Sequence, residues 1–145
     1  VTRTFSKAYA LAGLRVGYAI TEAGLSTLLE RLRESFNVGT LALAAAEAAL
    51  GDQAHMQRTM ALNVEQRSLL RQALRQRGWP VGHSQTNFLL VDFGARTPAI
   101  ERGLLARGIV LRPMAGYGLP DCLRITVGDA GENDALLQAL DEVAR

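Results

Sequence analysis

Residues 4–18 read TFSKAYALAGLRVGY, and the rest of the chain is best understood from this segment. It places Lys7 directly after a short β-branched stretch, among small residues and eight positions before Arg15. A lysine, unlike an arginine, can lose its proton and form a Schiff base with an aldehyde. The hydroxyls of Thr4 and Ser6, together with the planar guanidinium of Arg15, suit a phosphate monoester. Two interpretations stay open on the residues alone: a reactive amine beside a phosphate site, or a solvated lysine after a strand.

The composition of the chain makes this lysine unusual. The 145 residues hold fifteen arginines but only one lysine, and the formal net charge is +2 at pH 7. A general bias toward arginine accounts for the excess. The near-neutral balance gives no strong field for nucleic acid or a membrane surface, and no apolar run approaches the roughly 18 residues that span a bilayer. We therefore expect neither a nucleic-acid partner nor a membrane partner.

The sulfur and imidazole groups of the chain predict no metal chemistry. Cys122 is the single cysteine, which excludes an internal disulfide or a cysteine cluster, and we expect it to be a buried structural thiol. His55 and His83 lie far apart without the spacing of metal ligands, so no metal site is expected. The chain starts at Val1 without a signal sequence, which favours the cytoplasm, and without Met, which indicates a piece of a longer chain.

The first half of the chain alternates between short strands and helices. Thr21 is a suitable N-cap for a helix whose leucines recur at helical spacing. In the last predicted helix of this half, Arg67, Arg71 and Arg75 lie four residues apart and are interpreted as a solvated face, because no aromatic residues interleave. The expected elements are strands at residues 1–5 and 14–20 and helices at 21–32, 41–50 and 53–77.

From Gly78 onward the patterns follow the order strand, strand, helix, strand, strand, helix. This order favours an α+β arrangement, with helices covering one face of a sheet. Asp129 and Glu132 resemble a capping box at the start of the last helix. The named elements of this half are strands at 87–93, 109–112 and 122–127, a helix from Thr97 that Gly108 closes, and a final helix after Asp129.

Several motifs in the same order resemble the fold-type I, pyridoxal-phosphate-dependent aminotransferases, in the form found in histidinol-phosphate aminotransferases. Those enzymes carry Thr/Ser-x-Ser-Lys, then Ala-Gly-Leu-Arg, then Gly-Tyr or Gly-Phe, and the spacing from Lys7 to Arg15 matches. The resemblance implies an aspartate-aminotransferase-like α/β fold. In that fold, residues 1–52 would end the large cofactor-binding domain, 53–78 would be a long connecting helix, and 79–145 would form the small α+β C-terminal domain. Further similar segments are 36–38, 86–88, 108–112 and 122–128.

The resemblance also implies roles for the residues of the first motif. Lys7 would hold pyridoxal 5′-phosphate through a Schiff base and would later move a proton from the substrate's α-carbon to the cofactor. Arg15 would grip the cofactor phosphate, with Ser6 and Thr4 as hydroxyl partners. Because the family builds its site at a dimer interface, a homodimer is expected for the intact enzyme.

The two late arginines would bind substrates. The resemblance implies that Arg124, assisted by Arg112, holds the anionic group of the amino donor and then of the 2-oxo acid acceptor. For histidinol phosphate and 2-oxoglutarate these groups are a phosphate and a carboxylate, and a guanidinium can fork onto either. On the residues alone, an ordinary ion pair with Asp121 or Asp129 is an alternative for both arginines.

Two other functions remain as alternatives. A different fold-type I enzyme, such as an aromatic aminotransferase or a threonine-phosphate decarboxylase, would share the lysine motif and both late arginines. A non-catalytic dimerisation or interaction domain would leave Lys7 solvated and would use the long helix as a dimer seam. The family's upstream Asp, Asn and Tyr, which contact the cofactor ring, match no segment of this sequence. We therefore expect the 145-residue chain alone to be inactive.

Overall fold

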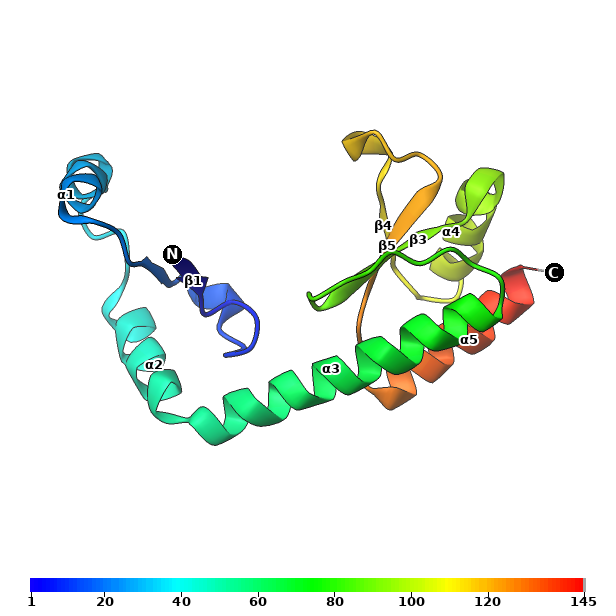
Figure 1. Cartoon of the computed structure of the whole chain (residues 1–145), viewed down its shortest axis with the longest axis horizontal. Helices are drawn as coiled ribbons and strands as arrows, with labels where there is room; N and C mark the ends of the chain where they lie inside the picture. The colour runs from blue at the N-terminus through cyan, green and yellow to red at the C-terminus, as the bar shows by residue number, and fades with distance from the viewer. Residues whose placement is uncertain (145) are drawn as a thin grey trace. The chain divides into compact units, whose positions relative to one another are not determined.

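The computed structural model describes residues 1–144, and these residues form two compact units. Unit 1 comprises Val1–Met60, and unit 2 begins at Ala61. The long helix α3 (Gln53–Gln76) is uninterrupted across this boundary (Figure 1). The two units therefore share one helix, and the domain boundaries expected near its two ends stay predictions.

Unit 1 begins with a β-hairpin. Strand β1 (Thr2–Thr4) pairs antiparallel with β2 (Gly17–Ala19). A Cβ atom on Gly17 would lie 2.7 Å from the carbonyl oxygen of Arg3, so only glycine lets the two strands approach this closely. The strand predicted over residues 14–20 is shorter than expected, because the chain before β2 turns through a 3-10 helix.

Two helices follow the hairpin in unit 1, α1 (Ala23–Leu32) and α2 (Thr40–Gly51). The N-cap of α1 is Glu22, whose carboxylate accepts a hydrogen bond from the backbone N–H of Leu25 at 2.9 Å. The prediction of Thr21 as the cap is therefore wrong by one residue. The Thr21 hydroxyl instead donates to the neighbouring carbonyl of Glu22, which leaves the longer carboxylate to reach the helix.

The apolar side chains of unit 1 are mostly exposed. α1 buries none of its residues, and its leucines range from 44% exposed at Leu25 to 80% at Leu32. Phe36, between the two helices, is 97% exposed. The buried hydrophobic cluster of this unit consists of Phe5, Val16, Ala42 and Ala46.

Unit 2 is built on an antiparallel three-stranded sheet in the order β3-β5-β4, with β5 in the centre. The additional strand expected before β3 is reduced to a single bridge between Val81 and Val91. The strands are β3 (Phe88–Asp92), β4 (Arg112–Pro113) and β5 (Cys122–Thr126).

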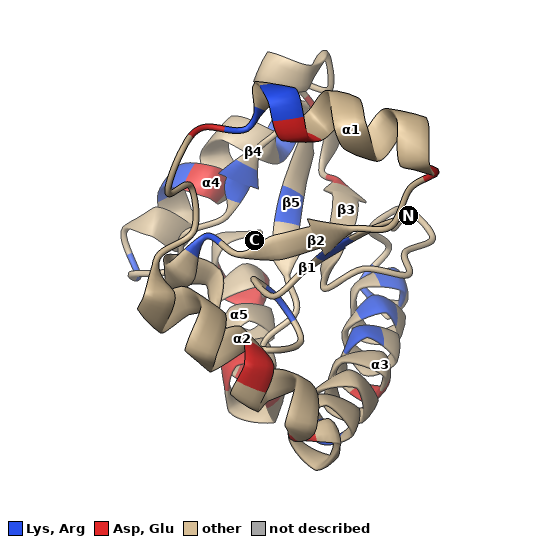
Figure 2. Ribbon diagram, turned by 90° about the vertical axis from the view of Figure 1, so that its left-hand side faces the viewer, with Lys and Arg blue, Asp and Glu red and all other residues tan. Residues whose placement is uncertain are grey.

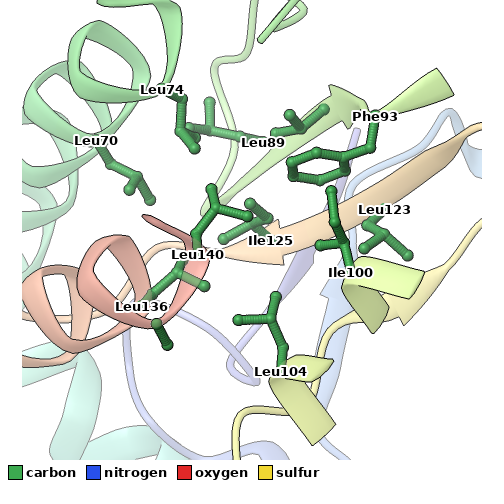
Figure 3. Close-up of a cluster of buried hydrophobic side chains, with 12 residues drawn as sticks. Leu70, Leu74, Leu89, Phe93, Ile100, Leu104, Leu123, Ile125, Leu136 and Leu140 are labelled. Atoms are coloured by element: carbon green, nitrogen blue, oxygen red, sulfur yellow. The ribbon is translucent and has the colours of Figure 1, made fainter. Parts of the chain in front are cut away.

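The core of unit 2 lies between this sheet and three helices, α4 (Thr97–Leu105), α5 (Ala130–Val143) and the second half of α3 (Figure 3). The predicted capping box at the start of α5 is confirmed, because Asp129 and Glu132 each bind the other's backbone N–H. The buried cluster comprises Leu70, Leu74, Leu89, Val91, Phe93, Ile100, Leu104, Leu123, Ile125, Leu136, Ala139 and Leu140.

The arginines of α3 do not share one environment. Arg75 is exposed, as the prediction of a solvated face requires. Arg67 is partly buried, and its guanidinium donates to the carbonyl of Thr86 at 2.8 Å. Asn63, one turn earlier, donates to the same carbonyl at 3.4 Å. The interpretation of a solvated face is therefore wrong for Arg67, which ties the helix to the segment before β3. It is also wrong for Arg71, which is partly buried and whose Nε is buried.

Candidate active site

The loop between β1 and β2 places Lys7 at a tight turn. The carbonyl of Lys7 accepts a hydrogen bond from the N–H of Ala10 at 2.8 Å, and the N–H of Leu11 donates to the carbonyl of Phe5 at 3.0 Å. The ring of Phe5 is buried, so the loop is anchored directly before the lysine. The Lys7 side chain is exposed, and among residues 1–144 no carboxylate forms an ion pair with it.

Arg15 closes the same loop in an unusual backbone conformation. Its φ of 53° and ψ of 47° lie in the left-handed region, which costs a residue other than glycine about 1–2 kcal/mol. One guanidinium nitrogen, Nη1, donates to the carbonyl of Ala12 at 2.8 Å and contacts the Ser6 hydroxyl at 3.5 Å. Strain of this kind persists where the surrounding contacts hold a residue in place, as at ligand-binding loops.

The hydroxyl of Thr4 lies at the start of the same loop as Ser6 and Arg15. Its oxygen accepts a hydrogen bond from the backbone N–H of Ser6 at 3.1 Å, which leaves its own O–H free to donate. The structure thus gathers Thr4, Ser6, Lys7 and Arg15, all expected from the sequence, in one loop. Within the described residues, no acidic side chain pairs with Arg15. Two hydroxyls and an unpaired guanidinium form a donor set that fits a phosphate dianion.

The two late arginines are direct neighbours on the sheet of unit 2. Arg112 of β4 stands opposite Arg124 of β5 in the antiparallel register. Leu123 and Ile125 point into the core, and because side chains alternate along a strand, Arg124 lies on the opposite face. Figure 2 shows the basic position in the middle of β5. Like charges directly opposite each other destabilise a sheet unless an anion lies between them.

Aromatic rings, rather than carboxylates, support these arginines. The guanidinium carbon of Arg124 lies 5.0 Å from the ring centre of Phe88, and its Nε is buried without a hydrogen-bond partner. The guanidinium of Arg112 lies 5.6 Å from the ring centre of Tyr117 and donates to its hydroxyl at 2.9 Å. Strand alternation could have placed Phe88 beside Arg124, but no sequence signal indicated Tyr117.

The alternative of ordinary ion pairs is not observed. The carboxylate of Asp129 caps α5, and in the described part of the chain neither it nor Asp121 forms an ion pair with Arg112 or Arg124. Buried or partly buried guanidinium groups without acidic partners require an anion or water. Arg112 and Arg124 are therefore candidates for binding an anion on this face of the sheet.

Other reactive groups of the described residues do not join either group. Cys122 is partly buried rather than fully buried, and burial, together with the negative charges of Asp92 and Asp121, raises the pKa of its thiol. Among residues 1–144, no cluster of three or more His, Cys, Asp or Glu side chains is placed to hold a metal ion. No helix in this range combines the length and apolar character that a membrane span requires.

Comparison with known proteins identifies the family. The model of the aminotransferases of class I and II matches residues 1–140. The chain belongs to this family. Histidinol-phosphate aminotransferase 2 of Methylococcus capsulatus is 48% identical over 143 residues, which cover 99% of this chain and 38% of that protein. Histidinol-phosphate aminotransferase 1 of Thiobacillus denitrificans is 49% identical, covering 99% of this chain and 37% of that protein. The chain thus spans less than two fifths of the length of these relatives.

A solved aminotransferase has the same fold. The crystal structure of histidinol-phosphate aminotransferase from Sinorhizobium meliloti, in complex with pyridoxal-5′-phosphate, matches this structure with a TM-score of 0.88 at 34% identity. The match covers 98% of this chain and 40% of that one. The α/β fold of the fold-type I aminotransferases, expected from the sequence, is confirmed by this likeness.

Proposed function

We propose that this chain is the C-terminal part of a histidinol-phosphate aminotransferase, an enzyme that exchanges an amino group between histidinol phosphate and 2-oxoglutarate. The observation that carries the proposal is the loop of unit 1, where the only lysine of the sequence follows Ser6, whose hydroxyl contacts the strained Arg15 at 3.5 Å. Curated bacterial relatives at 43–49% identity that bear this enzyme's name support the choice of substrate.

Pyridoxal 5′-phosphate is the proposed cofactor. The hydroxyls of Ser6 and Thr4 and the guanidinium of Arg15 fit its phosphate, because they are donors and no described carboxylate competes for them. When bound, this cofactor supplies the electron sink that stabilises negative charge at the substrate's α-carbon. Arg15 would fix the phosphate end, so that the aldehyde end is held within reach of the lysine.

Lys7 would perform two tasks in turn. Its Nζ would first hold the cofactor covalently, as an amine nucleophile can. Its free amine would then serve as the general base that accepts the proton from the substrate's α-carbon, and as the general acid that gives the proton back. The Lys7 side chain is exposed, and backbone hydrogen bonds hold the turn that carries it.

Arg124 and Arg112 would select substrates by charge. The reaction needs one site that accepts a phosphate from histidinol phosphate and then a carboxylate from the oxo acid. Two neighbouring guanidinium groups that form no ion pair within residues 1–144 would bind either anion. The alternatives of another fold-type I enzyme or an interaction domain are not favoured by the named relatives. We also propose that the intact enzyme is a homodimer in the cytoplasm.

The experiment uses the full-length polypeptide that contains this sequence. Lys7→Arg keeps the positive charge but removes the amine, so we expect the absorbance of the lysine-bound cofactor and all measurable amino transfer to be lost. Reduction of the wild-type holoenzyme with borohydride should leave the cofactor on the peptide that carries Lys7.

Histidinol phosphate, phenylalanine and threonine phosphate are then compared as substrates of the wild-type enzyme. Histidinol phosphate should be the preferred amino donor. An active Lys7→Arg enzyme would refute the role of the lysine. A preference for phenylalanine, or decarboxylation of threonine phosphate, would refute the substrate.

A further inference from the structure

Two buried amides connect α3 to the end of β5. Gln66 on α3 is 7% exposed and Asn133 on α5 is 5% exposed. The Nδ2 of Asn133 donates to the Oε1 of Gln66 at 3.1 Å. A buried amide that loses its partner is costly, so the two side chains hold each other in one arrangement.

Asn133 also binds both backbone groups of Gly128. Its Oδ1 accepts the N–H of Gly128, and its Nδ2 donates to the carbonyl of Gly128, each at 3.1 Å. β4 pairs with β5 only at Leu123 and Arg124, so it does not extend along the rest of that strand. Gly128 lies two residues after β5, so the Asn133 side chain, which Gln66 holds, fixes the backbone directly beyond the end of this strand.

The same side of α3 holds the start of β3. The carbonyl of Thr86 accepts two hydrogen bonds from this helix. One comes from Asn63, three residues before Gln66, and the other from Arg67, one residue after it. The hydroxyl of Thr86 in turn accepts the backbone N–H of Phe88 at 3.3 Å. The ring of Phe88 is the surface against which the guanidinium of Arg124 rests.

These contacts converge on Arg124. Its Nε makes no hydrogen bond within the described part of the chain, so the position of Arg124 depends on its own strand and on the ring of Phe88. Gln66 anchors the strand through Asn133, and Arg67 anchors the segment that carries the ring. We infer that Gln66 and Arg67 are positioning residues for the substrate-binding arginine, an inference that rests on the proposed function. Groups that hold a binding residue in its productive geometry govern affinity without touching the ligand.

The test compares matched variants of the full-length holoenzyme. Gln66→Met removes the acceptor for Asn133, and Arg67→Met removes the donor to Thr86, while both keep an unbranched apolar stem. Gln72→Met and Arg75→Met make the same changes at exposed positions of α3. We expect the first pair to raise the KM of both substrates about fivefold to tenfold with kcat within about twofold, and the controls to raise neither. Arg67→Lys should restore the donor and return KM to near the wild-type value.

A second measurement separates this inference from the proposed function. Inorganic phosphate is titrated into the holoenzyme, whose cofactor site is filled, and the binding lost in Arg124→Gln is assigned to Arg124. Gln66→Met and Arg67→Met should weaken this Arg124-dependent binding about fivefold. The inference is overturned if both variants merely lower Tm and leave KM and phosphate affinity unchanged, or if wild-type binding shows no dependence on Arg124. Failure to use histidinol phosphate would overturn the proposed function alone, because the phosphate titration still decides the role of Gln66 and Arg67.

Discussion

The two units of this chain hold their candidate site residues in different ways. Unit 2 has a cluster of twelve buried hydrophobic residues, and its arginines stand on a sheet packed on one face by helices. Unit 1 buries four hydrophobic residues, two of them alanines, and its helix α1 buries none. The lysine loop of unit 1 is therefore shaped mainly by local backbone contacts, whereas the arginine pair of unit 2 is supported by packing.

The largest expected effect is on the core of unit 2. Leu140 is fully buried, so Leu140→Ala should lower the free energy of unfolding of the 145-residue chain by about 2–5 kcal/mol. Urea unfolding followed by the fluorescence of Trp79, which packs on Phe93 beside this core, measures the loss.

The control for this prediction is Leu32→Ala in unit 1, where the leucine is 80% exposed. It should change stability by no more than about 0.5 kcal/mol, measured by circular dichroism, which reports on both units. A loss as large as that of Leu140→Ala would mean that the leucines of α1 are covered in solution, and the contrast between the units would fail.

A smaller effect is expected from the hairpin of unit 1. Gly17→Ala would drive a Cβ to within 2.7 Å of the Arg3 carbonyl oxygen, so we expect it to weaken the pairing of β1 and β2 by about 1–3 kcal/mol. Hydrogen exchange of the backbone amides in these strands should become faster, while the Trp79 transition of unit 2 stays unchanged.

Gly13→Ala is the matched control, because no atom lies within 4 Å of its added Cβ. Equal acceleration in both variants would show that the close approach at Gly17 does not shape the loop. Acceleration confined to Gly17→Ala would support local backbone geometry as the factor that positions Lys7.

The smallest effect concerns the thiol of unit 2. Burial and the charges of Asp92 and Asp121 raise the pKa of Cys122, so little reactive thiolate is present at neutral pH. Asp92→Asn removes one negative charge and should lower this pKa, speeding alkylation by iodoacetamide at pH 7.5 by about twofold. Asp134→Asn, at an exposed position of α5, should leave the rate unchanged. An equal gain in both variants would mean that net charge, not proximity, controls the thiol.

Sequence patterns predicted the features that depend on local chemistry. The capping box at Asp129 was predicted, because the donors and acceptors of a cap lie within four residues. The cap at Thr21 was predicted wrongly, because the neighbouring Glu22 competes for the same N–H groups. The partly buried state of Arg67 could not be predicted, because its acceptor on Thr86 lies nineteen residues away in the sequence.

The residues of the candidate site also fall into those that local sequence predicts and those that depend on distant contacts. The loop around Lys7 is a continuous motif, so its members could be chosen from spacing and from the family resemblance together. The support of Arg124 by Phe88 and of Arg112 by Tyr117 arises from strand register and from a turn, neither of which a single sequence specifies. A sequence can therefore suggest a role for an arginine more readily than it can predict the aromatic rings that the arginine contacts.

The opposed arginines of β4 and β5 have a thermodynamic consequence. A ligand that binds only the folded state stabilises it in proportion to the logarithm of its concentration. An anion between these two guanidinium groups also removes a repulsion that the folded sheet otherwise has to tolerate. Under the proposed function, the folding equilibrium of unit 2 would be linked to the concentration of the anion that binds these arginines. Unlike an osmolyte, which acts over the whole protein surface, the proposed substrate anion would stabilise the sheet by binding at this one place.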